Sequence, residues 1–251
     1  MSRIIEKFFV KLADIFRFVI SIFKQGLSAP FEFSEFIRQC FEIGWRSLPL
    51  ASIAGWITGF VFITQTKTSL DIFGNAPILP GLLAIAVVRS LAPLLTALVL
   101  CGRVASQIAA EINAMRVTEQ LDAMEVSGTN PVKFLLSTRV FACLTMLPIL
   151  CFYAMLLCFW GGYTSISTFQ QWSLSAFFDS VLSVLSFADF IGMLCRSLLF
   201  GLVIGICSCY VGYFHHYGAQ GVGKAAHSAV VNSIYLVFLS ELLLLRLFSI
   251  F

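Results

Sequence analysis

The segment GRVASQIAAEINAMRVTEQLDAMEVSGTNP, residues 102–131, carries four carboxylates between two long apolar runs. Charged side chains are costly in hydrocarbon, so we expect this segment to lie outside the bilayer. At about 100° per residue, its apolar residues fall on two helix faces roughly 180° apart. One face holds Ile108, Ile112 and Met115, and the other holds Val117, Leu121 and Met124. Since one straight helix cannot bury both faces, a break is predicted near residues 116–118.

The residues after this break predict a short, charged helix on the membrane surface. Thr118 is a suitable N-cap, and Glu119 and Asp122 would then lie in the first turn, where the helix dipole favours negative charge. Gly128 is a suitable C-terminal stop, and Pro131 beyond it cannot continue a helix.

The segment resembles the MlaE (YrbE) permeases, which are the membrane subunits of MCE-type ABC lipid transporters. The matching positions are Gly102-Arg103, Ala109-Ala110-Glu111, Met115, Glu119-Gln120, Asp122-Ala123, Gly128 and Pro131. A second block, Gly221-Val222-Gly223 followed by Ala225 and Val230-Val231, is similar to the family's GVG-x-A-T-T-x-x-V-V signature. The resemblance extends from about residue 45 to residue 245.

The resemblance implies that the segment couples the chain to an ATPase. The implied coupling residues are Glu111, Met115, Glu119, Gln120, Asp122 and Gly128. The alternative is a solvated loop that merely joins two helices. No glycine-rich loop ending in GK[ST] is present, so ATP and Mg are expected on a partner ATPase, and no cofactor is expected on this chain.

The composition indicates one integral membrane domain. The 251 residues are 59% hydrophobic and 12% charged, with a mean hydropathy of +0.93. The net charge of +3 is too small to favour nucleic-acid binding. Eight cysteines lie mostly within apolar runs without a CxxC pair, so we interpret them as small core residues and predict no metal site.

Residues 1–44 predict amphipathic helices that form an interfacial elbow. Apolar and basic residues alternate at helical spacing over residues 1–24, a pattern typical of helices in the membrane interface. An ordinary soluble amphipathic helix is the alternative, and the charges interrupt any signal-peptide core. The permease domain would then occupy residues 45–251.

Five transmembrane helices are predicted, which makes the fold an all-α integral membrane protein. Their approximate ranges are 48–66, 78–101, 132–161, 188–214 and 226–247. Residues 163–185 are expected to form an outer loop with an interfacial helix. Basic residues before the first span and around residues 102–131 place the N-terminus and the coupling segment in the cytoplasm, and the C-terminus outside.

Arg89 lies within the second predicted span, where a charge is a functional hypothesis by default. The family resemblance places Arg89, Ser90 and Leu91 in a lipid pocket at the dimer interface. Ser90 stands where the family pattern, Arg-Glu-Leu-x-Pro, has an acidic residue. Other departures are Ala226-His227 in place of two threonines and Thr138 in place of a proline.

Two further charges, Arg196 and Glu241, fall at similar depth in the last two predicted spans. An unpaired charge there would cost about 2.5–3.5 kcal/mol, so we predict an ion pair between them. Arg89 is the next candidate partner for Glu241, and the alternative is that Arg196 reaches the outer headgroups. Gly221 and Gly223 are predicted to form a structural turn that supports the coupling region, with close helix packing at Gly201, Gly205 and Gly212.

The resemblance implies a non-enzymatic permease subunit that moves phospholipid between membranes. The implied assembly is a homodimer with two ABC ATPase subunits and a hexameric MCE-domain ring, without nucleic acid. The implied location is the bacterial inner membrane, with the plastid inner envelope as the alternative. A lipid-modifying enzyme would need a nucleophile and a base, but the sequence has no HxxxxD or GxSxG motif. A membrane scaffold would leave the charges of residues 119–125 unexplained.

Overall fold

The computed structural model describes residues 15–26, 32–70, 78–169, 172–214 and 221–248. Throughout this part of the chain the regular structure is helical and contains no strand, which confirms the predicted all-α class. Five helical stretches are long and apolar enough to cross a membrane, as predicted. They are Phe33–Thr68, Leu79–Val117, Val132–Thr168, Phe187–Phe214 and Gly221–Leu247.

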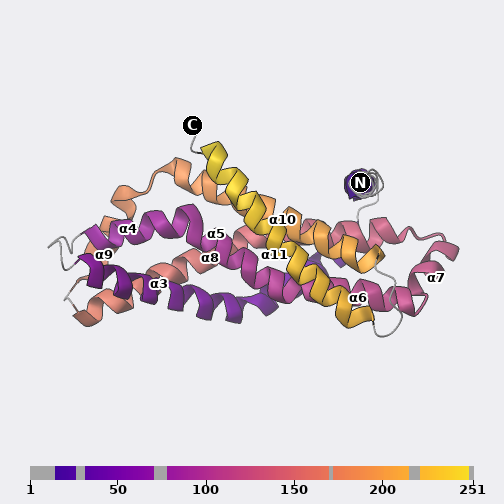
Figure 1. Ribbon diagram of the computed structural model, residues 1–251, viewed down its shortest axis with the longest axis horizontal. Helices are drawn as coiled ribbons and strands as arrows, with labels where there is room; N and C mark the ends of the chain where they lie inside the picture. Colours follow the sequence, from indigo (N-terminus) through magenta and orange to yellow (C-terminus); the bar gives the residue numbers. More distant parts are fainter. Residues whose placement is uncertain (1–14, 27–31, 71–77, 170–171, 215–220, 249–251) are drawn as a thin grey trace, which may run out of the picture.

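The N-terminal helix, residues 15–26, runs across the direction of the long helices and lies near the α7 end of the bundle (Figure 1). The Phe18 ring packs edge-on against Tyr210 and Phe214, with centroid distances of 5.6 and 5.5 Å. The Ser137 hydroxyl donates to the carbonyl of Ile22 at 3.1 Å. This crosswise packing supports the predicted interfacial orientation, while residues 1–14 of the predicted helix lie outside the described residues.

The predicted elbow helix is α2, Phe33–Gly44, which continues through the short η1, Trp45–Ser47, into α3, Leu48–Leu70. Along α2 and into η1, a row of apolar side chains at a spacing of four residues remains exposed. It consists of Phe33, Ile37 and Phe41 of α2 and Trp45 of η1. Such a row suits contact with the acyl boundary of a bilayer.

Helix α3 packs most extensively on α8, Thr138–Phe169. A Cβ atom built at Gly59 would lie 1.9 Å from the carbonyl oxygen of Cys158, and one at Gly161 would lie 2.0 Å from that of Trp56. Small residues at these positions let the two backbones touch, which is how helices associate in lipid.

The second span is a continuous helical stretch that contains two π turns. It comprises α4 (Leu79–Ala86), η4 (Val87–Leu91), α5 (Ala92–Leu100), η5 (Cys101–Ala105) and α6 (Ser106–Val117). Pro93 has no N–H to bond the carbonyl of Arg89, and the wide η4 turn directly precedes it. At 1.5 Å per residue, these 39 residues extend about 58 Å. A hydrocarbon core of about 30 Å cannot cover that length, so part of it projects beyond the bilayer.

A third π turn, η6 (Val132–Ser137), leads into α8. Helix α10 (Phe187–Phe214) packs on α8 and α6, and α11 (Gly221–Phe248) packs on α10 and α6. The predicted close packing at Gly201, Gly205 and Gly212 is confirmed. Their Cβ positions lie 2.7 to 3.1 Å from atoms of Cys143, Val140 and Ile112.

Two predictions about loops are wrong. Helix α8 extends to Phe169, so residues 163–169 are helical. The hydroxyls of Thr164, Ser167 and Thr168 donate to carbonyls of the helix, and the Ser165 hydroxyl contacts that of Thr64 at 2.9 Å. The expected helix within that loop is α9, Leu174–Val184, which packs on α4.

Gly221 and Gly223 form the first turn of α11 rather than a structural turn. Ala225 and Ala229 are buried against Ala109, which draws the helix start toward α6.

The predicted role of the cysteines is confirmed for seven of the eight, which are buried and unbridged, whereas Cys195 is exposed. Most of the buried thiols belong to the clusters that join α8, α5 and α10. They therefore act as small packing residues.

The α3–α8 contact gives a stability prediction. Gly59→Ala should destabilise the fold by about 1–3 kcal/mol, because its methyl group would force the two backbones apart. The melting temperature in detergent should fall by at least about 2 °C. Gly102→Ala is the matched control, because no atom lies within 4 Å of its Cβ position. Equal melting temperatures for the two variants would contradict the proposed contact.

Candidate functional site: a coupling segment and paired intramembrane charges

The predicted break in the charged segment is present between α6 and α7, where α7 is Gln120–Val126. The predicted capping is wrong, however, because Thr118 ends α6 instead of starting α7. Its hydroxyl donates backward to the carbonyl of Ala114 at 3.0 Å. Glu119 is the N-cap of α7, outside the first turn, with φ of 59°. A left-handed residue reverses the chain direction abruptly, which the sequence alone did not indicate.

The predicted stop at Gly128 is confirmed. Gly128 has φ of +80°, its N–H donates to Glu125, and the N–H of Thr129 donates to Met124 at 2.9 Å. This pair of bonds is a Schellman motif, which satisfies the last carbonyls of α7. Asp122 lies in the first turn, as predicted.

The predicted coupling residues separate into a tip and a stem. Glu119, Gln120 and Asp122 are exposed at the tip, and Figure 1 shows α7 at one extreme of the bundle. Glu111 and Met115 lie on α6, which is the stem, and are partly buried. The sequence interpretation did not include Val126, whose side chain is 90% exposed at the tip.

The stem is tied to two neighbouring helices, α8 and α10. Glu111 accepts from the buried Arg139 of α8 at 3.0 Å, and also from Gln107 at 2.8 Å. Arg116 donates to the carbonyl of Tyr213 and lies 4.7 Å above the centre of its ring. The Glu111 carboxylate therefore faces the bundle, so it holds the stem and is less suited to touching a partner.

Away from α7, the structure contains the predicted ion pair between α10 and α11. Arg196 donates to Glu241 at 3.3 Å, and both side chains are over 90% buried. The Ser90 hydroxyl also donates to the same Glu241 oxygen, at 3.4 Å. The alternative in which Arg196 extends to the headgroups is therefore wrong.

Arg89 pairs with Asp189 at 2.8 Å rather than with Glu241. Asp189 is near the start of α10 and also accepts from the backbone and hydroxyl of Ser186. The Arg89 side chain remains 60% exposed, so part of its guanidinium stays available to a ligand. Ser90 and Leu91 beside it are partly buried in the η4 turn.

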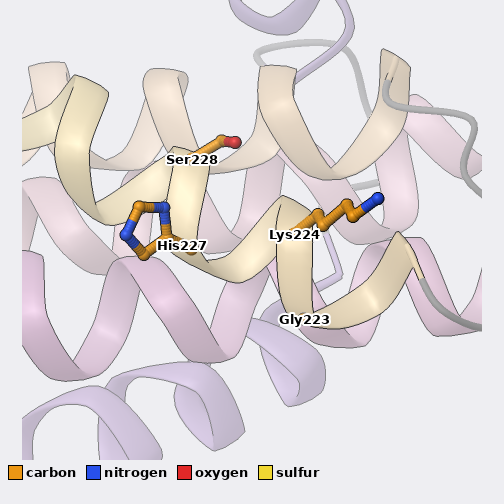
Figure 2. Close-up of a pocket in the computed structure, with 4 residues that line it drawn as sticks. All are labelled: Gly223, Lys224, His227 and Ser228. Carbon is orange, nitrogen blue, oxygen red and sulfur yellow. The ribbon is translucent and has the colours of Figure 1, made fainter.

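A shallow pocket at the start of α11 is lined by Gly223, Lys224, His227 and Ser228. Figure 2 shows Lys224, His227 and Ser228 pointing in different directions from the helix. His215 and His216, the other histidines, lie outside the described residues. Within the described ranges no group of three potential metal ligands occurs.

Comparison with known proteins identifies the family. Residues 36–247 match the family model described as Permease MlaE. The chain belongs to the MlaE permease family. The permease is 36% identical to a probable ABC transporter permease protein of Rickettsia prowazekii over 222 residues, 88% of this chain and 86% of the relative. It is 37% identical to a similarly named protein of Synechocystis over 208 residues, 83% and 79% of the two chains.

A third relative is the probable ABC transporter permease protein ycf63 of Pyropia yezoensis, which is 32% identical over 213 residues, 83% of this chain and 79% of the relative. These matches establish the permease as a membrane subunit of the ABC transporter type. Such a subunit implies partner ATPase subunits.

The buried pair gives a charge-exchange prediction for the permease. Arg196→Glu and Glu241→Arg should each destabilise the fold by about 3–5 kcal/mol, because each leaves like charges buried together. The double variant should recover much of the folded yield. Size-exclusion chromatography of a fluorescent fusion measures that yield, with Arg246→Glu as the control at an exposed position in the last turn of α11. A double variant as impaired as the two single losses combined would contradict the energetic pairing.

Proposed function

We propose that the permease moves phospholipid between membranes as the homodimeric core of an MCE-type transporter. Two ABC ATPases bind its α7 tips and hydrolyse ATP with Mg, and a hexameric MCE-domain ring binds the opposite end. The bacterial inner membrane is its proposed location. The observation that carries the proposal is the α7 tip, held at one extreme of the bundle by defined caps at Glu119 and Gly128.

The α7 tip has the chemistry of a docking helix. It exposes three carboxylates, Glu119, Asp122 and Glu125, together with the Val126 side chain. A charged rim around an apolar anchor is typical of protein interfaces. A loop that only joined two helices would not require a left-handed N-cap and a Schellman stop around seven residues.

The apolar surfaces support a lipid substrate. A groove of about 1000 Å³ between α10 and α11 is lined mainly by aliphatic and aromatic side chains, including Leu202, Ile206 and Leu239. Its size and lining suit acyl chains. In the η4 turn, the exposed part of Arg89 offers a cation to a phosphate group.

The outer face of α11 supports the proposed dimer. Its exposed apolar residues outside the groove include Phe238, Leu242 and Leu245. Polar and ionic groups of the same helix, Ser233 and Glu241, point into the bundle. A second copy packing on this face would cover apolar surface without burying a charge.

The docking proposal predicts that charge reversal at Glu119 weakens ATPase binding. Glu119→Lys should lower the amount of co-purified ATPase at least about tenfold, because it places a cation at the positive N-terminus of α7. Glu119→Asn is the matched control. Asparagine tolerates the left-handed conformation and removes only the charge, so we expect an intermediate loss.

Membrane insertion and the size-exclusion profile should remain unchanged in both variants. If a Glu119→Lys complex kept full ATPase association and lipid-dependent ATP turnover, α7 would not be the docking helix. Transfer of a fluorescent phospholipid between vesicles by the reconstituted wild-type complex tests the substrate. ATP hydrolysis without such transfer would contradict the phospholipid assignment.

A further inference from the structure

A chain of polar contacts crosses the base of the coupling segment. Arg46 lies 4.0 Å from Glu42, and Glu42 accepts from Gln107 at 3.3 Å. Gln107 also donates to Glu111 at 2.8 Å, and Glu111 pairs with Arg139 at 3.0 Å. The contacts join the elbow helix α2, the stem helix α6 and the start of α8.

The two arms of the coupling segment, α6 and α8, share α10 as a neighbour and otherwise pack on different helices. Helix α6 packs chiefly on α10 and α11, whereas α8 packs on α3, α10 and α2. Glu111 and Arg139 flank α7 in the sequence, so their bond closes the base of the segment that carries α7. A displacement of α7 then reaches α8 through this bond.

Arg139 is unusual for an arginine near the end of a helix, because only 1% of its side chain is exposed. Its Nη2 bonds Glu111, while Nε and Nη1 have no hydrogen-bond partner in the described structure. A buried guanidinium with a single carboxylate partner is expensive to maintain if its task is stability alone. Its presence at the base of the coupling segment therefore indicates a role in positioning the helices that it joins.

We propose that Arg139 is a positioning residue that transmits movement of the coupling segment into the bundle. By holding Glu111, it makes α6 and α8 move together when an ATPase displaces α7, and Gln107 and Glu42 extend the link to α2. This inference rests on the proposed function. It adds the residues that carry force away from the docking helix.

The test is a double-variant cycle at the Glu111–Arg139 pair. Glu111→Gln and Arg139→Met each leave one charge without its partner, so both should lower the melting temperature. In the double variant no charge remains at this site, so the melting temperature should return to near the wild-type value. Arg139→Lys keeps the charge and should retain part of the function. Arg246→Met is the control, since Arg246 is exposed in the last turn of α11.

The full complex with its ATPase is reconstituted in vesicles, and transfer of a fluorescent phosphatidylethanolamine is measured together with ATP hydrolysis. For the double variant we expect normal ATPase association, hydrolysis at half the wild-type rate or more, and lipid moved per ATP at least about tenfold lower. A purely structural role predicts that regained stability restores transfer. Transfer per ATP within about twofold of wild type would overturn the proposal.

A second measurement separates this inference from the substrate assignment. Hydrogen exchange of the complex is compared with and without vanadate trapping of the ATPase, which requires no lipid substrate. In the wild type, trapping should change protection in α2 and in the first turns of α8, and the double variant should lose both changes. Equal changes in the two proteins would overturn the link, even if the wild type moved a different substrate.

Discussion

The close approach of α3 and α8 is the contact on which the rest of the bundle depends. Gly59 faces a carbonyl of α8 and Gly161 faces a carbonyl of α3, so neither position has space for a side chain. In a bilayer, apolar side chains gain little by leaving lipid for protein, and backbone proximity therefore matters more than hydrophobicity. With α3 fixed on one side of α8, the other side is free to receive α10, whose Gly201 and Gly205 repeat the same kind of contact.

Helix α8 is therefore the element that connects the two functional ends. Its first turn holds Arg139, which reaches the stem of the coupling segment. Away from the coupling segment, α10 forms two ion pairs with other helices, Asp189 with Arg89 and Arg196 with Glu241. Each pair joins different helices, so the charges restrict how α4 to α6, α10 and α11 move relative to one another.

The sequence predicted the features that depend on composition and on charge costs, and failed where local geometry decides. The five apolar stretches, the Gly128 stop and the Arg196–Glu241 pair follow from hydropathy, glycine preference and the cost of lone charges. Glu119 in a left-handed conformation was not predictable, because no propensity favours glutamate there. The Glu111–Arg139 pair was also missed, since helical periodicity says nothing about which of two distant helices a side chain meets.

Ser90 shows how a departure from a family pattern is accommodated by its surroundings. The buried Glu241 carboxylate already neutralises Arg196, and the Ser90 hydroxyl donates to the same oxygen. A second carboxylate at position 90 would lie beside Glu241 and repel it. The two carboxylates would have to share Arg196, because Arg89 already pairs with Asp189. A neutral donor avoids this repulsion and still bonds Glu241. The serine therefore fits a site in which each buried carboxylate has its own arginine, and the η4 turn stays tied to α11 without an additional charge.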